Sequence, residues 1–153
     1  MAVTPAPATG TPVETSEAIA GRLRLSATRL ARRLRQQADT GLSPSQLSGL
    51  AVVERHGPLT LGALAEHEQV APPSVTRVVA KLETDGFLTR QPDPDDRRVT
   101  RVAVTTKGRN LLVASRRRKT AWLTTRLESM DPDQRARLAD ALDVLDALTT
   151  EPR

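Results

Sequence analysis

The sequence predicts a mainly α-helical fold of the α+β type that contains one β-hairpin. Apolar residues recur at three- and four-residue steps along most of the chain, which is the period of an amphipathic helix. Between residues 87 and 105 the period falls to two, which is typical of paired strands. A length of 153 residues suits one domain with an extension.

The N-terminal part predicts a tail followed by four helices. Residues 1–14 are rich in proline, alanine and threonine without periodicity, so we expect a disordered tail. Ser43-Pro44-Ser45-Gln46 combines a capping serine, a proline suited to the first helical position and a glutamine that can close a capping box. The expected helices run from near Ser16 to Gly41, from Pro44 to a stop at His56-Gly57-Pro58, from Leu61 to about Glu68 behind a Thr60 cap, and from the prolines at 72 and 73 to Asp85-Gly86.

The C-terminal part predicts a hairpin and two further helices. Residues 87–91 and 99–105 have the pattern of antiparallel strands, and the charged, turn-rich loop 92–98 joins them. A long helix is expected from Thr106 to about Ser129. Asp131-Pro132-Asp133-Gln134 starts the last helix with the same capping logic as Ser43.

Composition excludes several classes of protein. The chain has no cysteine, which excludes a disulfide scaffold, thiolate zinc sites and thiol redox sensing. Phe87 and Trp122 are the only aromatic residues, so stacking on single-stranded nucleic acid is not the expected activity. No apolar run approaches the roughly 20 residues of a membrane span, and no signal peptide is recognisable, so we expect no membrane partner and a cytoplasmic protein.

The charges are separated along the chain. The net charge of +5 comes from 23 basic and 18 acidic residues. Residues 22–35 and 97–119 carry clusters of basic side chains and no acid, whereas residues 128–151 are mainly acidic. This separation favours a polyanionic partner. Whether the basic runs 22–35 and 116–119 contact that partner stays open, because such runs are commonly solvated helix faces.

The order of elements is that of a winged helix-turn-helix. In this arrangement the second helix of the motif lies in the major groove of DNA, and its N-terminal residues meet base edges. Val75, Val78, Val79 and Leu82 occupy its other face and should anchor it. The two prolines either touch a thymine methyl group or only fix the direction of the helix. The candidate DNA-binding residues of this helix are Pro72, Pro73, Ser74, Thr76, Arg77 and Lys81.

The hairpin supplies a second candidate contact. Arg97 and Arg98 lie at the tip of an otherwise acidic loop, where a guanidinium can enter the narrow minor groove. Asp96 is expected to orient an arginine, either one at the tip or Arg77. The alternative is a solvated turn whose opposite charges cancel.

The first and last helices carry apolar stripes longer than a small winged helix can cover. We expect these stripes to form a two-fold dimer interface, which sets two recognition helices about one DNA turn or a simple multiple of it apart on a near-palindromic site. The alternative is packing within one subunit. The stripes are Ile19, Leu23, Leu30 and Leu34 in the first helix, and Leu138, Leu142, Leu145 and Leu148 in the last.

These expectations divide the chain into four parts. Residues 1–14 are the tail, 15–40 the N-terminal dimerisation helix, 42–105 the winged helix-turn-helix domain, and 106–149 the C-terminal helices that complete the dimerisation region.

Roughly residues 16–149 resemble the MarR family of bacterial transcriptional regulators. The family's wing signature is Asp-x-Arg, five residues, an aliphatic residue and threonine, with a glycine soon after. Here it reads Asp96-Arg97-Arg98, residues 99–103, Val104-Thr105 and then Gly108, with valine where leucine is usual. Leu61-Gly62-Ala63-Leu64-Ala65 and residues 74–88 look like the family's helix-turn-helix.

The resemblance implies a homodimer that binds double-stranded DNA. Arg98 would enter the minor groove with Asp96 as its orienting partner, and Ser74, Thr76 and Arg77 would face the major groove. Family members often repress genes and release DNA when a small aromatic or phenolic effector binds where the winged helix joins the dimer helices. The expected location is the cytoplasm, on the nucleoid when bound to DNA.

No catalytic motif and no cofactor site is recognisable, so we expect no enzyme. His56 and His67 have no nucleophile motif around them. Glu66-His67-Glu68 does not form a metal site, because consecutive residues of a helix do not share a face. The alternative function is a winged helix that binds another protein, whose affinity would depend less on salt.

Overall fold

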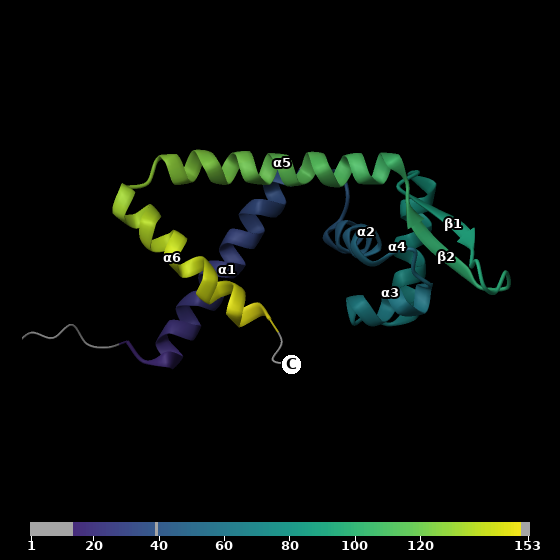
Figure 1. Cartoon of the computed structure of the whole chain (residues 1–153), viewed down its shortest axis with the longest axis horizontal. Coiled ribbons are helices and arrows are strands. Elements are labelled where there is room, and N and C mark those ends of the chain that lie inside the picture. The colour runs from purple at the N-terminus through teal and green to yellow at the C-terminus, as the bar shows by residue number, and fades with distance from the viewer. Residues whose placement is uncertain (1–13, 39, 151–153) are drawn as a thin grey trace, which may run out of the picture. The chain divides into compact units, whose positions relative to one another are not determined.

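A computed structural model of the chain describes residues 14–38 and 40–150 (Figure 1). The chain divides into two compact units, Met1–Leu34 and Arg35–Arg153. Residues 1–13 of the expected tail lie outside the described residues. No described helix combines the length and the apolar character needed to cross a membrane.

The described residues form six helices and one two-stranded antiparallel sheet in the predicted order, which confirms the mainly α-helical prediction. The first strand begins one residue later than predicted because the N–H of Phe87 donates to the carbonyl of Leu82, at 2.8 Å, and so closes the preceding helix. The second strand lacks one predicted residue at each end. The elements are α1 (Ser16–Ala38), α2 (Pro44–His56), α3 (Leu61–Glu68), α4 (Pro72–Thr84), β1 (Leu88–Pro92), β2 (Thr100–Val104), α5 (Thr106–Glu128) and α6 (Pro132–Thr149).

Helix caps account for several of these boundaries. The predicted capping box is present at α2: the Ser43 hydroxyl accepts from the amide of Gln46, and the Gln46 side chain accepts from the amide of Ser43. The Thr60 hydroxyl caps α3 by accepting from the amide of Ala63. Asp131 caps α6 in a different way from Ser43, because its carboxylate accepts from the amide of Asp133.

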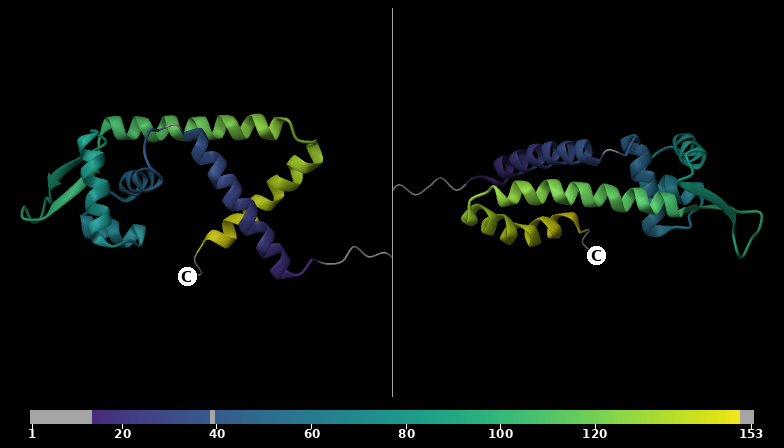
Figure 2. Two further views of the ribbon diagram at one scale, coloured as in Figure 1. Left: turned by 180° about the vertical axis from the view of Figure 1, so that it is seen from behind. Right: turned by 90° about the horizontal axis from the view of Figure 1, so that it is seen from above.

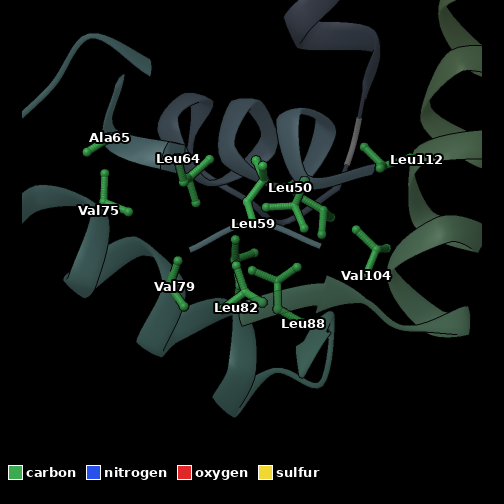
Figure 3. Packing of buried hydrophobic residues seen from close by; sticks show 12 residues of the cluster. Leu50, Leu59, Leu64, Ala65, Val75, Val79, Leu82, Leu88, Val104 and Leu112 are labelled. Carbon is green, nitrogen blue, oxygen red and sulfur yellow. The ribbon is translucent and has the colours of Figure 1, made fainter. Parts of the chain in front are cut away.

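One hydrophobic core joins helices α2, α3 and α4, both strands and the first half of α5 (Figure 3). Leu50, Leu64 and Leu82 point toward one another from the three helices, and each is at most 1% exposed. Leu88 and Val104, paired across the hairpin, close this core from the strands. We call residues 42–115 the winged-helix core. Figure 2 shows from two sides that the hairpin extends away from helices α2, α3 and α4.

The junction between the hairpin and α5 is tightly packed. The Thr105 hydroxyl accepts from the amide of Gly108 and donates to the carbonyl of Gly86, at 3.1 and 2.7 Å. A Cβ atom on Gly108 would lie 2.4 Å from the carbonyl oxygen of Phe87, so this position has no room for a side chain. Residues Thr105 and Gly108 therefore fix how the long helix leaves the sheet.

The last helix contributes no buried residue. Leu138, Leu142 and Leu148 are 38%, 52% and 67% exposed, and Leu145 is half-buried. In the first unit, Ile19 and Leu30 of α1 are exposed and Leu23 and Leu34 are half-buried. The two stripes remain predicted dimer contacts.

Candidate nucleic-acid interface

Helix α4 has one buried face and one exposed polar face. Pro72 and Pro73 form its first turn, where a missing N–H breaks no helical hydrogen bond. Val75, Val79 and Leu82 are buried in the core, and Val78 is half-buried. The remaining face is exposed, and it holds every residue of this helix that is predicted to meet DNA: Pro72, Pro73, Ser74, Thr76, Arg77 and Lys81.

The polar residues of this face differ in the bonds that they already make. The Thr76 hydroxyl donates to the carbonyl of Pro72, at 3.1 Å. Lys81 pairs with Asp85 one turn later, at 2.7 Å. Ser74 and Arg77 have no side-chain hydrogen bond within the described part of the chain, so both can bind an external partner without breaking an internal contact.

The turn between α3 and α4 depends on a residue that the sequence analysis did not single out. Gln69 ends α3 in the left-handed conformation, with φ of 53°. Its N–H and that of Val70 donate back to carbonyls of the last turn of α3, which closes the helix as a glycine usually would. Glutamine has no preference for this conformation, so no residue type signalled it.

The hairpin tip presents an arginine to solvent. Within the loop 93–99, which we call the tip loop, Asp96 accepts from the backbone N–H of Arg98, at 3.0 Å, and from its Nε, at 3.1 Å. The Arg98 side chain is 91% exposed. Hydrogen bonds from the Arg98 side chain and backbone lower the pKa of Asp96, so this carboxylate stays ionised near neutral pH. The arginine that Asp96 contacts is therefore Arg98 and not Arg77.

Arg97 and Asp93 lie in the same loop as Asp96 and Arg98, and their side chains have opposite environments. Arg97 is exposed, and its side chain makes no hydrogen bond or ion pair within the described residues. The Asp93 side chain is buried under the tip loop and accepts hydrogen bonds there. The acidic residues of the loop are thus not all exposed to solvent, which reduces the electrostatic repulsion between the loop and an approaching phosphate.

The basic run 116–119 is partly used inside the protein. Arg116 makes two hydrogen bonds of 2.7 Å to Glu54 of α2, and Arg118 donates to the carbonyl of Ala38. The Arg116 hydrogen bond is the main cause of a lowered Glu54 pKa. The acidic partner of Arg116 therefore lies in α2.

No group of three or more metal-ligating side chains occurs among the residues that the structure describes. His56 and His67 stack with ring centroids 4.5 Å apart. A hollow of about 170 Å³ lies between α2, β2 and the start of α5, and Arg109 and Glu54 are its charged residues. Its apolar walls come mainly from Val53, Pro58 and Val104.

Comparisons with known proteins agree with this geometry. The MarR family model matches residues 42–100. An HTH-type transcriptional regulator of Mycobacterium leprae is 42% identical over 134 residues, which cover 87% of this chain and 94% of that protein. A crystal structure from Pseudomonas aeruginosa superposes with a TM-score of 0.81 at 31% identity, covering 92% of this chain and 100% of the other. FabT of Streptococcus pneumoniae, solved in complex with DNA, shares the fold at 19% identity with a TM-score of 0.64, covering 84% and 96%.

A three-helix core with an antiparallel wing, in a chain whose relatives are transcriptional regulators, defines a winged helix-turn-helix regulator. The chain belongs to the MarR family. Its relatives are transcriptional regulators and not enzymes, which agrees with the class that the sequence predicted.

Proposed function

We propose that the protein acts as a homodimer that binds a near-palindromic, double-stranded operator and represses transcription there. Helix α4 reads the major groove through Ser74, Thr76 and Arg77, and Arg98 enters the adjacent minor groove. This places its activity in the cytoplasm, on the nucleoid. The DNA complex of the pneumococcal protein supports the proposal at the level of the fold.

One observation carries the DNA-binding part of this proposal. An arginine with 91% of its side chain exposed stands at the tip of a hairpin that shares a core with the buried face of α4. Its backbone N–H, Nε and NH2 all donate to the carboxylate of Asp96, so hydrogen bonds and not packing orient it. Exposed arginines that are oriented but unpacked suit the strong negative potential of a narrow minor groove.

The dimer rests on the apolar face of α6. Leu142 and Leu148 are more than half exposed, on a helix that contributes nothing to the core of its own unit. Contiguous apolar surface of this kind marks an interaction site. A two-fold axis would bring the same face of a second copy onto it and would present two α4 helices to successive major grooves.

The hollow between α2, β2 and α5 supports a small aromatic effector. Its volume of about 170 Å³ is comparable to the engineered cavity of about 150 Å³ that binds benzene. Arg109 would meet a phenolate or carboxylate, while Val53 and Val104 contact the ring. Ala103→Phe, which fills this hollow, is expected to abolish release of DNA by such a compound while leaving DNA binding intact.

A binding titration tests the DNA contact. The operator is obtained by selecting bound sequences from random duplex DNA, and affinity is measured by fluorescence anisotropy. Arg98→Ala is expected to weaken binding at least about 10-fold, roughly 1.4 kcal/mol, while the protein stays folded. Arg55→Ala, which removes the same charge from an exposed position of α2, is the control and is expected to change affinity less than about 2-fold.

Salt dependence separates this function from a winged helix that binds protein. Contacts to about six or more phosphates make affinity fall by orders of magnitude between about 50 and 200 mM salt. Binding of the selected duplex by Arg98→Ala with wild-type affinity would remove the wing from the mechanism. A protein that ignores duplex DNA at low salt would favour the protein-binding alternative.

A further inference from the structure

Asp93 is the one charged side chain that is buried among the described residues of the chain. It is 5% exposed, and its two oxygens have different partners. Oδ1 accepts from the amides of Asp95 and Asp96, at 2.8 and 3.1 Å, and Oδ2 accepts from Nε of Arg101. A buried carboxylate persists only when its charge is compensated in this way, so the group is built into the tip loop.

Arg101 connects this carboxylate to the helix-turn-helix. It lies on β2, and its NH1 donates to the carbonyl of Pro58 in the connection between α2 and α3, at 3.3 Å. Next to it, Leu59 and Val102 exchange two backbone hydrogen bonds of 3.1 and 2.7 Å. Arg101 therefore links the tip loop of the wing to the body that carries α4.

The same loop residues lead from Asp93 to the exposed arginine. The Asp96 amide donates to Asp93, while the Asp96 carboxylate accepts from the backbone and Nε of Arg98. A continuous set of hydrogen bonds thus runs from Pro58 through Arg101, Asp93 and Asp96 to Arg98. Each of these hydrogen bonds lies within the wing or joins the wing to the connection between α2 and α3.

We propose that Asp93 and Arg101 are positioning residues for Arg98, and that they fix the tip loop in its DNA-binding conformation before DNA arrives. A side chain that is already held in place loses less conformational entropy on binding. The inference rests on the proposed function, because it assumes that Arg98 contacts DNA. It explains why three aspartates lie in a basic wing: Asp93 orders the loop from inside, Asp96 orients Arg98, and only Asp95 faces solvent without a side-chain partner among the described residues.

A double-mutant cycle tests this coupling. We measure binding of the selected duplex by wild type, Asp93→Asn, Arg98→Ala and the double variant. Asparagine keeps an oxygen for the loop amides, but a neutral amide oxygen accepts weaker hydrogen bonds than a carboxylate, and the charge that holds Arg101 is lost. We expect Asp93→Asn to weaken binding about 5- to 10-fold, and Arg98→Ala to cost at least about 10-fold in wild type but less than about 3-fold in the Asp93→Asn background.

Asp95→Asn is the matched control, because it makes the same charge change in the same loop without touching Arg101. It is expected to leave affinity within about 2-fold of wild type. Hydrogen exchange of the free protein gives a readout that does not depend on DNA. The amides of Asp95 and Asp96 should exchange at least about 10-fold faster in Asp93→Asn, while those of Leu50 and Leu82 keep the wild-type rate.

Three results overturn the proposal, and they are distinguishable. If the losses from Asp93→Asn and Arg98→Ala multiply, Asp93 acts independently of Arg98 and the positioning role is wrong, although DNA binding stands. If Arg98→Ala has no effect in the wild-type background, the proposed wing contact fails and the positioning role fails with it. Unchanged exchange at Asp95 and Asp96 would likewise show that the loop does not depend on Asp93.

Discussion

The winged-helix core and helix α6 differ in what their leucines contact. Leu50, Leu64 and Leu82 are at most 1% exposed and pack against one another within one chain. Leu142 and Leu148 of α6 are more than half exposed, although α6 has a comparable apolar stripe. The winged-helix core can therefore fold on contacts from its own chain. The stripe of α6 contributes hydrophobic stabilisation only when a further surface buries it.

This difference separates two roles that the sequence pattern alone does not distinguish. Apolar residues at three- and four-residue steps predict a helix with one apolar face in both regions. Only the structure shows that the apolar face of α4 is covered within its own unit, whereas α6 contributes no buried residue to that unit. The winged-helix core supplies the DNA-reading geometry, and α6 supplies the surface for the proposed second copy.

Leucine truncations give the largest expected effect and test the comparison directly. Leu82→Ala removes a fully buried side chain and should lower the free energy of unfolding by about 2–5 kcal/mol, measured by urea titration. Leu142→Ala should leave the fold intact but weaken dimerisation on the order of 10-fold, measured by sedimentation across protein concentrations. A stable wild-type monomer at micromolar concentration would remove the proposed role of α6.

The sequence predicted the elements well where a residue type has a local physical effect. Ser43, Pro44 and Gln46 marked the start of α2 because their caps and dihedral preferences act within one turn. Thr60 marked α3 in the same way. The exposed residues of α4 followed from the helical period once Val75, Val79 and Leu82 were assigned to the core.

Contacts between distant residues could not be predicted in this way. Glu54 and Arg116 are 62 residues apart, and nothing in either neighbourhood indicates the other. Asp93 was recognisable as one acid of the wing, but its burial depends on Arg101 and on how the tip loop turns. Gln69 was missed because its left-handed conformation is imposed by the packing of α3 and α4 and not by glutamine itself.

Gly108 tests the tight packing inside the winged-helix core, at the point where the hairpin meets α5. Gly108→Ala places a Cβ 2.4 Å from the Phe87 carbonyl and 2.9 Å from Cγ1 of Val104, so the start of α5 must shift. We expect a loss of about 1–2 kcal/mol, since overpacking outweighs the helix propensity gained. Gly62→Ala in α3 is the control, because the nearest atom to its new Cβ is 3.9 Å away. It should be neutral or add up to about 1 kcal/mol, by thermal melting; equal effects of the two changes would contradict the close approach at Gly108.

The ion pair between Glu54 and Arg116, which joins α5 to α2 at the edge of the winged-helix core, gives the smallest expected effect. The folded-state pKa of Glu54 is lowered, mainly by the Arg116 hydrogen bond. The stabilisation is therefore present above the ordinary glutamate pKa of about 4.3 and is lost as the pH falls through the lowered value. Arg116 is 56% exposed, so solvent screens the pair and we expect only about 0.5–1 kcal/mol.

Glu54→Gln isolates this contribution, because glutamine resembles the protonated acid. The difference in unfolding free energy between wild type and Glu54→Gln should be largest near pH 7 and should fall toward zero as the pH drops through the lowered pKa of Glu54, in urea titrations at matched salt. Other carboxylates of the chain titrate in the same range, including Asp93 and Asp96, but they are common to both proteins and cancel in the difference. A difference that stays constant between pH 7 and pH 3 would mean that Arg116 stabilises the core through packing of its side chain and not through its charge.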